Sequence, residues 1–332
     1  MVRARRAIAG RTTPVFFITS SEHSHCYRGI VSMKQENEQV SVSHPLGEIV
    51  GIPSSLQPLV EIDKLREIDG LGKPAFIHDD HRWVLPILAW AQMEGLIMTP
   101  SLLVLFDRHT DFAIPFLGAD EQGRKLATEY NAVPTVEAAI QVCWEHADPN
   151  DGDWVSAGME LGIIGDAVVF GAEAGHQCDS RKGFPYLDMQ GRQHSFWSLP
   201  WPSGCLLHQG CLADHYYEPR GLWDALGWKP GALNLEGRSL ILDFDLDAFA
   251  IDTHLGPNFS WPERIFEHQF HSKSNAASIE GMTAADFVSD LVRESSMITF
   301  AREPNYCGGE QDSDAIFELM NRYMFKSLAS AV

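Results

Sequence analysis

Residues 102–111 read LLVLFDRHTD, and this stretch decides the fold. Its first five residues are apolar, as expected of a strand that is buried on both faces of a sheet. Asp107, His109 and Asp111 then follow at every second position, so on an extended strand end their side chains point to one side. Carboxylates in apolar surroundings are unfavourable unless they are paired or bind a metal ion. The stretch therefore predicts a buried strand that ends at a metal site.

Residues 240–249, LILDFDLDAF, repeat this pattern with a second apolar run followed by Asp243, Asp245 and Asp247. We interpret both stretches as strands whose carboxyl ends meet at one site. An Asp-x-Asp-x-Asp pattern can also open an EF-hand calcium loop, but such a loop needs glycine at its sixth position, where this sequence has Ala248.

The rest of the sequence alternates between expected strands and expected helices. We expect strands at 74–78, 102–106, 167–170, 239–244 and 297–301, and helices at 60–69, 133–146, 283–293 and 314–330, with a further helix after Asp79 or Asp80. Asp79 or Asp80 is expected to cap that helix, and Thr283 with Asp286 is expected to cap the one at 283–293. The alternation predicts a three-layer α/β/α fold with a mostly parallel sheet, in which sites form at the carboxyl ends of the strands.

Composition limits the classes of partner. The chain has 332 residues, 45% of them hydrophobic, and a formal net charge of -20, which argues against nucleic acid and anionic membranes. The six cysteines are scattered without a Cys-x-x-Cys pair, so we expect them to be reduced in a cytoplasmic protein. We expect residues 1–58 to be a flexible or wrapping segment and residues 59–332 to form one domain. The oligomeric state stays open, a homo-oligomer included.

A third contributor to the metal site is His81, which follows the expected strand at 74–78. The candidate ligands are His81, Asp107, His109, Asp111, Asp245 and Asp247. Six ligands are too many for one tetrahedral zinc ion, whereas oxygen-rich sets with some imidazole suit octahedral ions such as Mn²⁺. Bridging carboxylates would place two such ions roughly 3.5–4 Å apart. Taken singly, each piece could instead be a solvated loop or a histidine of the core.

Three segments resemble motifs of the arginases and other ureohydrolases. Residues 106–111 are similar to their Asp-Ala-His-x-Asp motif, residues 244–247 to their Phe-Asp-x-Asp motif, and Asp80-His81 to the end of their Gly-Gly-Asp-His motif. The resemblance implies an arginase-like fold and two Mn²⁺ ions. It assigns His81, Asp107, Asp111 and Asp245 to one ion, and Asp107, His109, Asp245 and Asp247 to the other. It further implies that Asp111 orients the attacking hydroxide and that Glu303 binds the guanidinium of the substrate.

The sequence departs from ordinary arginases at two places. Ala157 stands where a histidine serves as proton shuttle, and the apolar residues 112–117 replace a loop that recognises free amino acids. These departures resemble peptide arginases, which convert arginine side chains of ribosomally made peptides to ornithine and urea. The implied partner is an arginine-containing precursor peptide, which Trp197 and Trp201 could cover. The alternatives are a hydrolase of a small guanidino or amide compound such as agmatine, and a non-catalytic metal-binding protein.

Overall fold

The computed structural model describes residues 49–68, 70–113, 135–148, 152–171, 184–199, 235, 237–251, 253, 257–271 and 283–325. The chain divides into two units, residues 1–42 and 43–332, and the elements described here belong to the second unit. The predicted flexible or wrapping segment, residues 1–58, falls mostly outside the described residues and stays a prediction, as does the boundary at residue 59.

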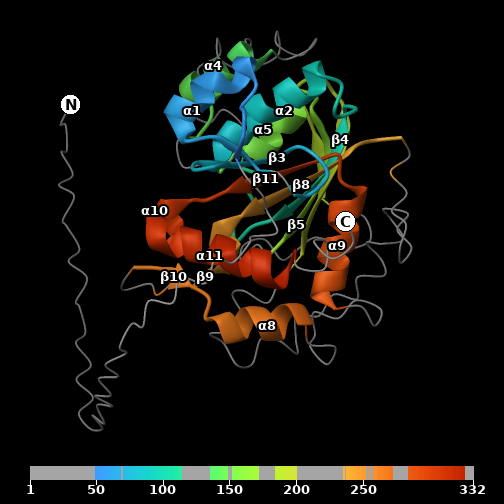
Figure 1. The fold of residues 1–332 in the computed structure, drawn as a ribbon. Coiled ribbons are helices and arrows are strands. Elements are labelled where there is room, and N and C mark those ends of the chain that lie inside the picture. Colours follow the sequence, from blue (N-terminus) through green and yellow to red (C-terminus); the bar gives the residue numbers. More distant parts are fainter. Residues whose placement is uncertain are drawn as a thin grey trace, which may run out of the picture. The chain divides into compact units, whose positions relative to one another are not determined.

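A sheet of nine described strands lies at the centre of this unit, in the order β1-β2-β3-β11-β8-β4-β5-β7-β6 (Figure 1). The strands are β1 (Ile49–Val50), β2 (Arg66–Ile68), β3 (Ala75–His78), β4 (Ser101–Phe106), β5 (Ile164–Phe170), β6 (Phe184–Leu187), β7 (Gln193–Leu199), β8 (Leu240–Asp245) and β11 (Met297–Ala301). Neighbours from β3 to β7 run parallel, and antiparallel pairs occur only towards the two edges of this described sheet. Strands β9 (Ala250–Ile251) and β10 (Phe259–Ser260) form a separate antiparallel pair.

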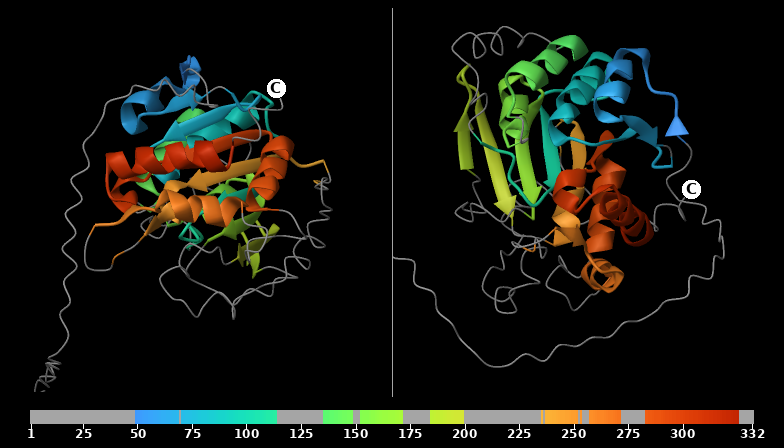
Figure 2. Two further views of the ribbon diagram at one scale, coloured as in Figure 1. Left: turned by 60° about the horizontal axis from the view of Figure 1, so that its bottom comes forward. Right: turned by 90° about the vertical axis from the view of Figure 1, so that its left-hand side faces the viewer.

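Helices cover both faces of the sheet (Figure 2). One face carries α1 (Gln57–Asp63), α2 (Val84–Met93), α4 (Val136–Glu145) and α5 (Trp154–Glu160), whereas the other carries α8 (Glu263–His271), α9 (Ala284–Glu294), α10 (Pro304–Cys307) and α11 (Glu310–Tyr323). The described residues also form the short 3-10 helices η1 (Ser54–Leu56), η2 (His81–Trp83) and η5 (Leu246–Phe249).

The side chains of β4 show why the strand sequence is apolar without interruption. Leu103 and Leu105 pack in the core beneath α2, α4 and α5, while Leu102, Val104 and Phe106 pack in the core beneath α8, α9 and α11. A strand with both faces buried needs apolar residues at every position rather than at every second one. The predicted three-layer α/β/α fold with a mostly parallel sheet is confirmed.

Several local predictions are confirmed. Strands β3, β4, β5, β8 and β11 and helices α4 and α9 occur where the sequence pattern placed them, within a few residues at their ends. Helix α11 overlaps the helix expected at 314–330, but it begins at Glu310 and ends at Tyr323, and residues 326–330 lie outside the described residues. Helix α9 begins with the expected capping box, in which the Thr283 hydroxyl accepts from the Asp286 backbone N–H and the Asp286 carboxylate accepts from the Thr283 backbone N–H. This reciprocal pair satisfies two backbone donors that a helix start leaves without partners inside the helix.

Other local predictions were wrong. The helix expected over 60–69 is the shorter α1, which ends at Asp63 and is followed by Lys64 with a positive φ of 51°, and residues 66–68 form β2 instead. Asp80 lies at the start of η2 but its side chain makes no capping hydrogen bond, and its Oδ2 accepts from Arg82. The hairpin of β6 and β7 was not predicted. No helix among the described residues is both long enough and apolar enough to span a bilayer.

Candidate metal centre

The predicted ligands lie at one end of four strands that are neighbours in the sheet. His81 follows β3, Glu303 follows β11, Asp245 ends β8 and Asp107 follows β4, and the sheet order of these strands is β3-β11-β8-β4. Because all four strands are parallel, their carboxyl ends meet at the same edge. The strand order therefore brings together residues that are up to 222 positions apart in the sequence.

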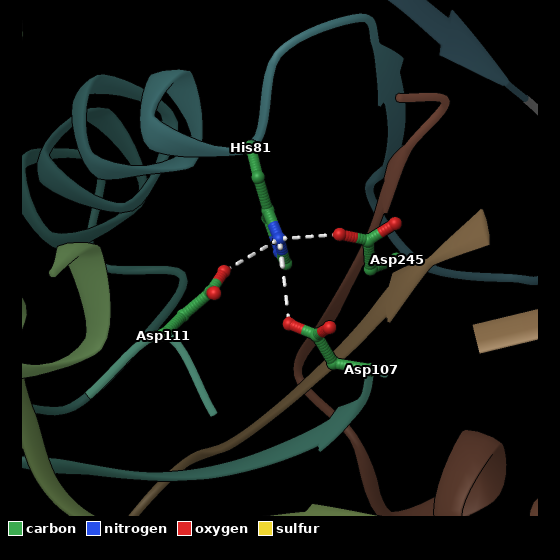
Figure 3. A group of neighbouring side chains, drawn as sticks. All are labelled: His81, Asp107, Asp111 and Asp245. Carbon is green, nitrogen blue, oxygen red and sulfur yellow. Dashed lines mark hydrogen bonds and ion pairs between the residues drawn. The ribbon is translucent and has the colours of Figure 1, made fainter. Parts of the chain in front are cut away.

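His81 is the centre of a first group of possible ligands (Figure 3). Its ring is fully buried, and its Nδ1 faces three carboxylate oxygens: Asp245 Oδ2 at 3.1 Å, Asp111 Oδ2 at 3.2 Å and Asp107 Oδ2 at 3.7 Å. One ligand atom from each of the four residues lies within 4.8 Å of the others. This spacing allows all four atoms to contact a single ion.

The opposite side of the His81 ring is fixed by a fourth carboxylate, that of Asp243. Its Nε2 lies 2.7 Å from Asp243 Oδ2, and the Thr299 hydroxyl donates to Asp243 Oδ1 at 2.8 Å. An ionised carboxylate only accepts hydrogen bonds, so Nε2 donates to it, and a neutral ring then directs the lone pair of Nδ1 at the cluster. Such a carboxylate behind a histidine is typical of metal-binding histidines, because it fixes the tautomer and the ring orientation.

A second group consists of Asp107, His109 and Asp247. His109 Nδ1 lies 2.9 Å from Asp247 Oδ2 and 3.8 Å from Asp107 Oδ1. Asp107 therefore belongs to both groups, with Oδ2 facing the first and Oδ1 facing the second. A carboxylate shared in this way is the arrangement that bridges two ions in binuclear sites. Asp245, which the resemblance assigned to both ions, lies in the first group only.

The pKa values of this cluster show that it contains excess negative charge. Burial, reinforced by the charges of Asp111 and Asp245, raises the pKa of Asp107 well above its ordinary value. Burial and the charge of Asp247 raise the pKa of Asp245 to about 7. The Oδ2 atom of Asp107 is buried without a hydrogen-bond partner. Buried carboxylates this close together are unfavourable without a cation, so the residues present fit a metal centre.

The pKa values of the two histidines are raised as well, but by the neighbouring carboxylates and against the effect of burial. Burial alone would lower the pKa of His81, but the charge of Asp243 and the surrounding carboxylates raise it well above its ordinary value. The hydrogen bond with Asp247 raises the pKa of His109 to about 9 against the effect of burial. Burial also acts to raise the pKa of Asp247, but the partnership with His109 outweighs it and lowers that pKa. A metal ion would therefore have to displace protons from this cluster.

Glu303 lies against the first group. It follows β11 in a left-handed backbone conformation with φ of 42°, and it is 4% exposed. Its Oε1 accepts a hydrogen bond from the backbone N–H of His81 at 2.7 Å. Further along α10, the ring of Tyr306 contacts the ring of His109, with centroids 5.8 Å apart. The structure thus places a buried carboxylate beside the cluster, as the sequence prediction required.

All six predicted ligands come together, but His109 and Asp111 do so for a reason other than the predicted one. Strand β4 ends at Phe106, and Asp111 has a positive φ of 46°, so the chain turns instead of continuing as an extended strand. Sequence reasoning missed Asp243, although it was part of the quoted motif, and Trp154, whose indole Nε1 donates to Asp111 Oδ2 at 2.7 Å. The sequence gives no signal for Trp154, because a tryptophan at the start of a helix is ordinarily a core residue.

The expectation that aromatic side chains cover a peptide needs correction at Trp197. Trp197 lies on β7 and is 5% exposed within the core, so it does not line a substrate surface, and Trp201 lies outside the described residues. Within residues 112–117 only the first two are described, and the Phe112 ring stacks on Phe196 with centroids 4.1 Å apart. Ala157 is fully buried in α5 and offers no proton-transferring group.

Comparisons with known proteins give a weak structural similarity. No protein-family model matches the chain, and no curated protein matches it. A hypothetical agmatinase from Burkholderia thailandensis is 16% identical over 79% of this chain and 60% of its own, with a TM-score of 0.36. Proclavaminate amidino hydrolase from Streptomyces clavuligerus is 16% identical over 77% of this chain and 63% of its own, with a TM-score of 0.35.

The arginase of Helicobacter pylori is 12% identical over 74% of this chain and 70% of its own, with a TM-score of 0.29. The chain thus spans less than two thirds of the length of the agmatinase and of the amidino hydrolase. Similarity at this level does not assign an activity, and the function has to rest on the residues of the site.

Proposed function

We propose that the protein is a hydrolase that uses two Mn²⁺ ions to cleave the guanidino group of an arginine side chain within a peptide, which releases urea and leaves ornithine. The observation that supports the proposal most directly is the position of Asp107, whose two carboxylate oxygens face two adjoining groups of possible ligands. The oxygen-rich ligand set with two imidazoles favours Mn²⁺ over a single tetrahedral zinc ion.

When bound, a pair of such ions supplies Lewis-acid activation of a water nucleophile. His81, Asp107, Asp111 and Asp245 would bind one ion, and Asp107, His109 and Asp247 would bind the other. Asp243 and Thr299 would keep the His81 ring in the orientation that its metal-binding role needs.

Glu303 would bind the guanidinium group. A guanidinium is planar and permanently charged, so a carboxylate can accept paired hydrogen bonds from it. The His81 backbone N–H fixes Oε1 of Glu303 beside the metal ligands, so a guanidinium group bound by Glu303 would lie next to the metal site. Preorganised placement of this kind lowers the entropic part of the barrier.

The carboxylate of Asp111 would accept a hydrogen bond from the attacking water and direct it at the guanidinium carbon. A carbon–oxygen bond forms, the bond from that carbon to the side-chain nitrogen breaks, and the protons of the water pass to nitrogen. Guanidinium and water thereby give urea and an alkylammonium group, so atoms and charge balance.

Two observations support a peptide as the substrate. The apolar residues after Asp111 offer no polar side chains for the α-amino and α-carboxylate groups of free arginine, and Phe112 stacks in an aromatic cluster instead. The net charge of -20 also favours a cationic ligand such as an arginine-bearing peptide.

The decisive experiment measures urea release by the Mn²⁺-loaded protein from three substrates: an arginine within a blocked short peptide, free arginine and agmatine. We expect the highest kcat/KM for the peptide. Glu303→Gln should reduce kcat/KM strongly for every guanidino substrate, because the charge partner is lost. Glu267→Gln, which makes the same change at an exposed position on α8, is the matched control and should leave kcat/KM unchanged.

Other results of this experiment would each change the proposed function in a different way. Higher efficiency on free arginine or agmatine would replace the peptide by a small guanidino compound. Two bound Mn²⁺ ions without urea release from any of the three substrates would support a non-catalytic metal-binding protein. A single tightly bound zinc ion, or no metal after Mn²⁺ loading, would contradict the binuclear centre.

A further inference from the structure

Residues 111–113 are joined to the start of α5 by a set of four hydrogen bonds. Trp154 Nε1 donates to Asp111 Oδ2 (2.7 Å), Val155 N to Asp111 O (3.1 Å), Ala113 N to Gly152 O (2.8 Å) and Ser156 Oγ to Ala113 O (2.7 Å). These hydrogen bonds involve both the backbone carbonyl and the side-chain carboxylate of Asp111. The start of α5 therefore fixes both the backbone and the carboxylate of Asp111.

Asp111 needs such support because its backbone is in the left-handed region, with φ of 46°. For a residue other than glycine this conformation is uncommon, and it persists where the surrounding contacts determine it. Without the bonds to α5, the segment after β4 would relax towards an ordinary conformation. That relaxation would withdraw the Asp111 carboxylate from the cluster.

The indole of Trp154 hydrogen-bonds to Asp111 Oδ2, which is the same oxygen that faces His81 Nδ1. The indole is fully buried, its ring centroid lies 4.7 Å from that of His81, and its N–H donates to Asp111 Oδ2, which itself lies 3.2 Å from His81 Nδ1. An indole N–H can only donate, so it orients a carboxylate oxygen without competing for a cation. The rigid ring, packed against His81, fixes the direction of the donor.

We propose that Trp154 is a positioning residue for the metal site, which fixes Asp111 as a ligand and thereby sets the affinity of the first group for its ion. The inference rests on the proposed binuclear centre. It predicts an asymmetric effect, because Trp154 contacts residues of the first group, whereas the second group consists of Asp107, His109 and Asp247. Partners of metal ligands typically change metal affinity by roughly 10- to 100-fold when they are removed.

The test compares Trp154→Phe with Trp197→Phe, using the full-length protein. Both changes keep a buried aromatic ring and remove an indole N–H, but the N–H of Trp197 has no hydrogen-bond partner. Equilibrium dialysis with Mn²⁺ and metal analysis gives the dissociation constant of each ion. We expect Trp154→Phe to weaken one of the two ions by roughly 10- to 100-fold, and Trp197→Phe to leave both dissociation constants unchanged.

Indole fluorescence supplies an independent readout. Mn²⁺ bound in the first group would lie close to Trp154 and change its emission, so Trp154→Phe should lose most of the Mn²⁺-dependent change that the wild type shows. Trp197→Phe should retain that change. A purely structural role for Trp154 would lower the melting temperature without separating the affinities of the two ions.

A second variant distinguishes weaker metal binding from a folding defect. Ser156→Ala removes one bond to Ala113 without altering a ligand or the indole, and it should weaken the same ion by a smaller factor. The inference is overturned if Trp154→Phe binds both ions as tightly as Trp197→Phe does. It is also overturned if Trp154→Phe unfolds while Ser156→Ala binds both ions normally. If the wild type binds no Mn²⁺, the proposed function and this inference fail together, which distinguishes that result from the other two.

Discussion

Replacing Asp245 by Asn should remove the pH dependence that this residue gives to the stability of the metal-free protein. Asp245 ends β8 within the first ligand group, and burial together with the charge of Asp247 raises its pKa from 3.8 to about 7. Because the folded state binds this proton more tightly than the unfolded state, the contribution to stability is fully present below pH 3.8. It is lost as the pH rises to about 7.

The magnitude follows from the two pKa values. One pH unit of difference is worth about 1.4 kcal/mol, so a change from 3.8 to about 7 corresponds to about 4 kcal/mol. Asn is neutral at every pH and keeps an oxygen that can accept from the Asp247 backbone N–H, as Oδ1 of Asp245 does. Relative to the wild type, the variant should therefore gain up to about 4 kcal/mol between pH 4 and pH 8 when metal is absent.

The assay is urea unfolding of chelator-treated wild type and Asp245→Asn at several pH values from 4 to 8. The difference between the two free energies of unfolding reports the charge of Asp245, including its effect on the pKa values of Asp107, His81 and His109. Adding Mn²⁺ at pH 8 should then stabilise the wild type and have little effect on the variant, because only the wild type keeps the full first ligand group. A difference that stays constant from pH 4 to 8 would refute the reasoning from burial and like charge.

Three further predictions test other parts of the structure. Asp107→Asn should abolish binding of both Mn²⁺ ions, whereas Asp247→Asn should weaken one, because only Asp107 belongs to both groups; metal analysis after dialysis decides between them. Thr299→Val removes the hydroxyl that donates to Asp243, and it should lower the free energy of unfolding by about 1–3 kcal/mol and weaken the ion bound by the first group. Thr283→Ala removes the side-chain cap of α9 and should cost about 1 kcal/mol in urea unfolding, with no change in Mn²⁺ affinity.

The sequence by itself determined the elements whose signals are local. An apolar run of strand length that ends in an acidic residue predicted β4 and β8, because a central strand buried on both faces leaves no other pattern. The pair Thr283 and Asp286 predicted the start of α9, because the capping box involves residues only three positions apart. The local pattern was misleading where strand pairing outweighed it. A helix was expected to include residues 66–68, but these residues form β2 and pair with β3.

The tertiary structure alone decided how the site is assembled. Asp111 reaches the cluster through a left-handed turn supported by α5, and Asp243 and Trp154 contact His81 and Asp111 from elements that are 43 or more positions away in sequence. Strand order brings His81 and Glu303 together, although 222 positions separate them. A sequence pattern records which residue types are present at a fixed spacing, whereas contacts between distant elements depend on the order and register in which the strands pair.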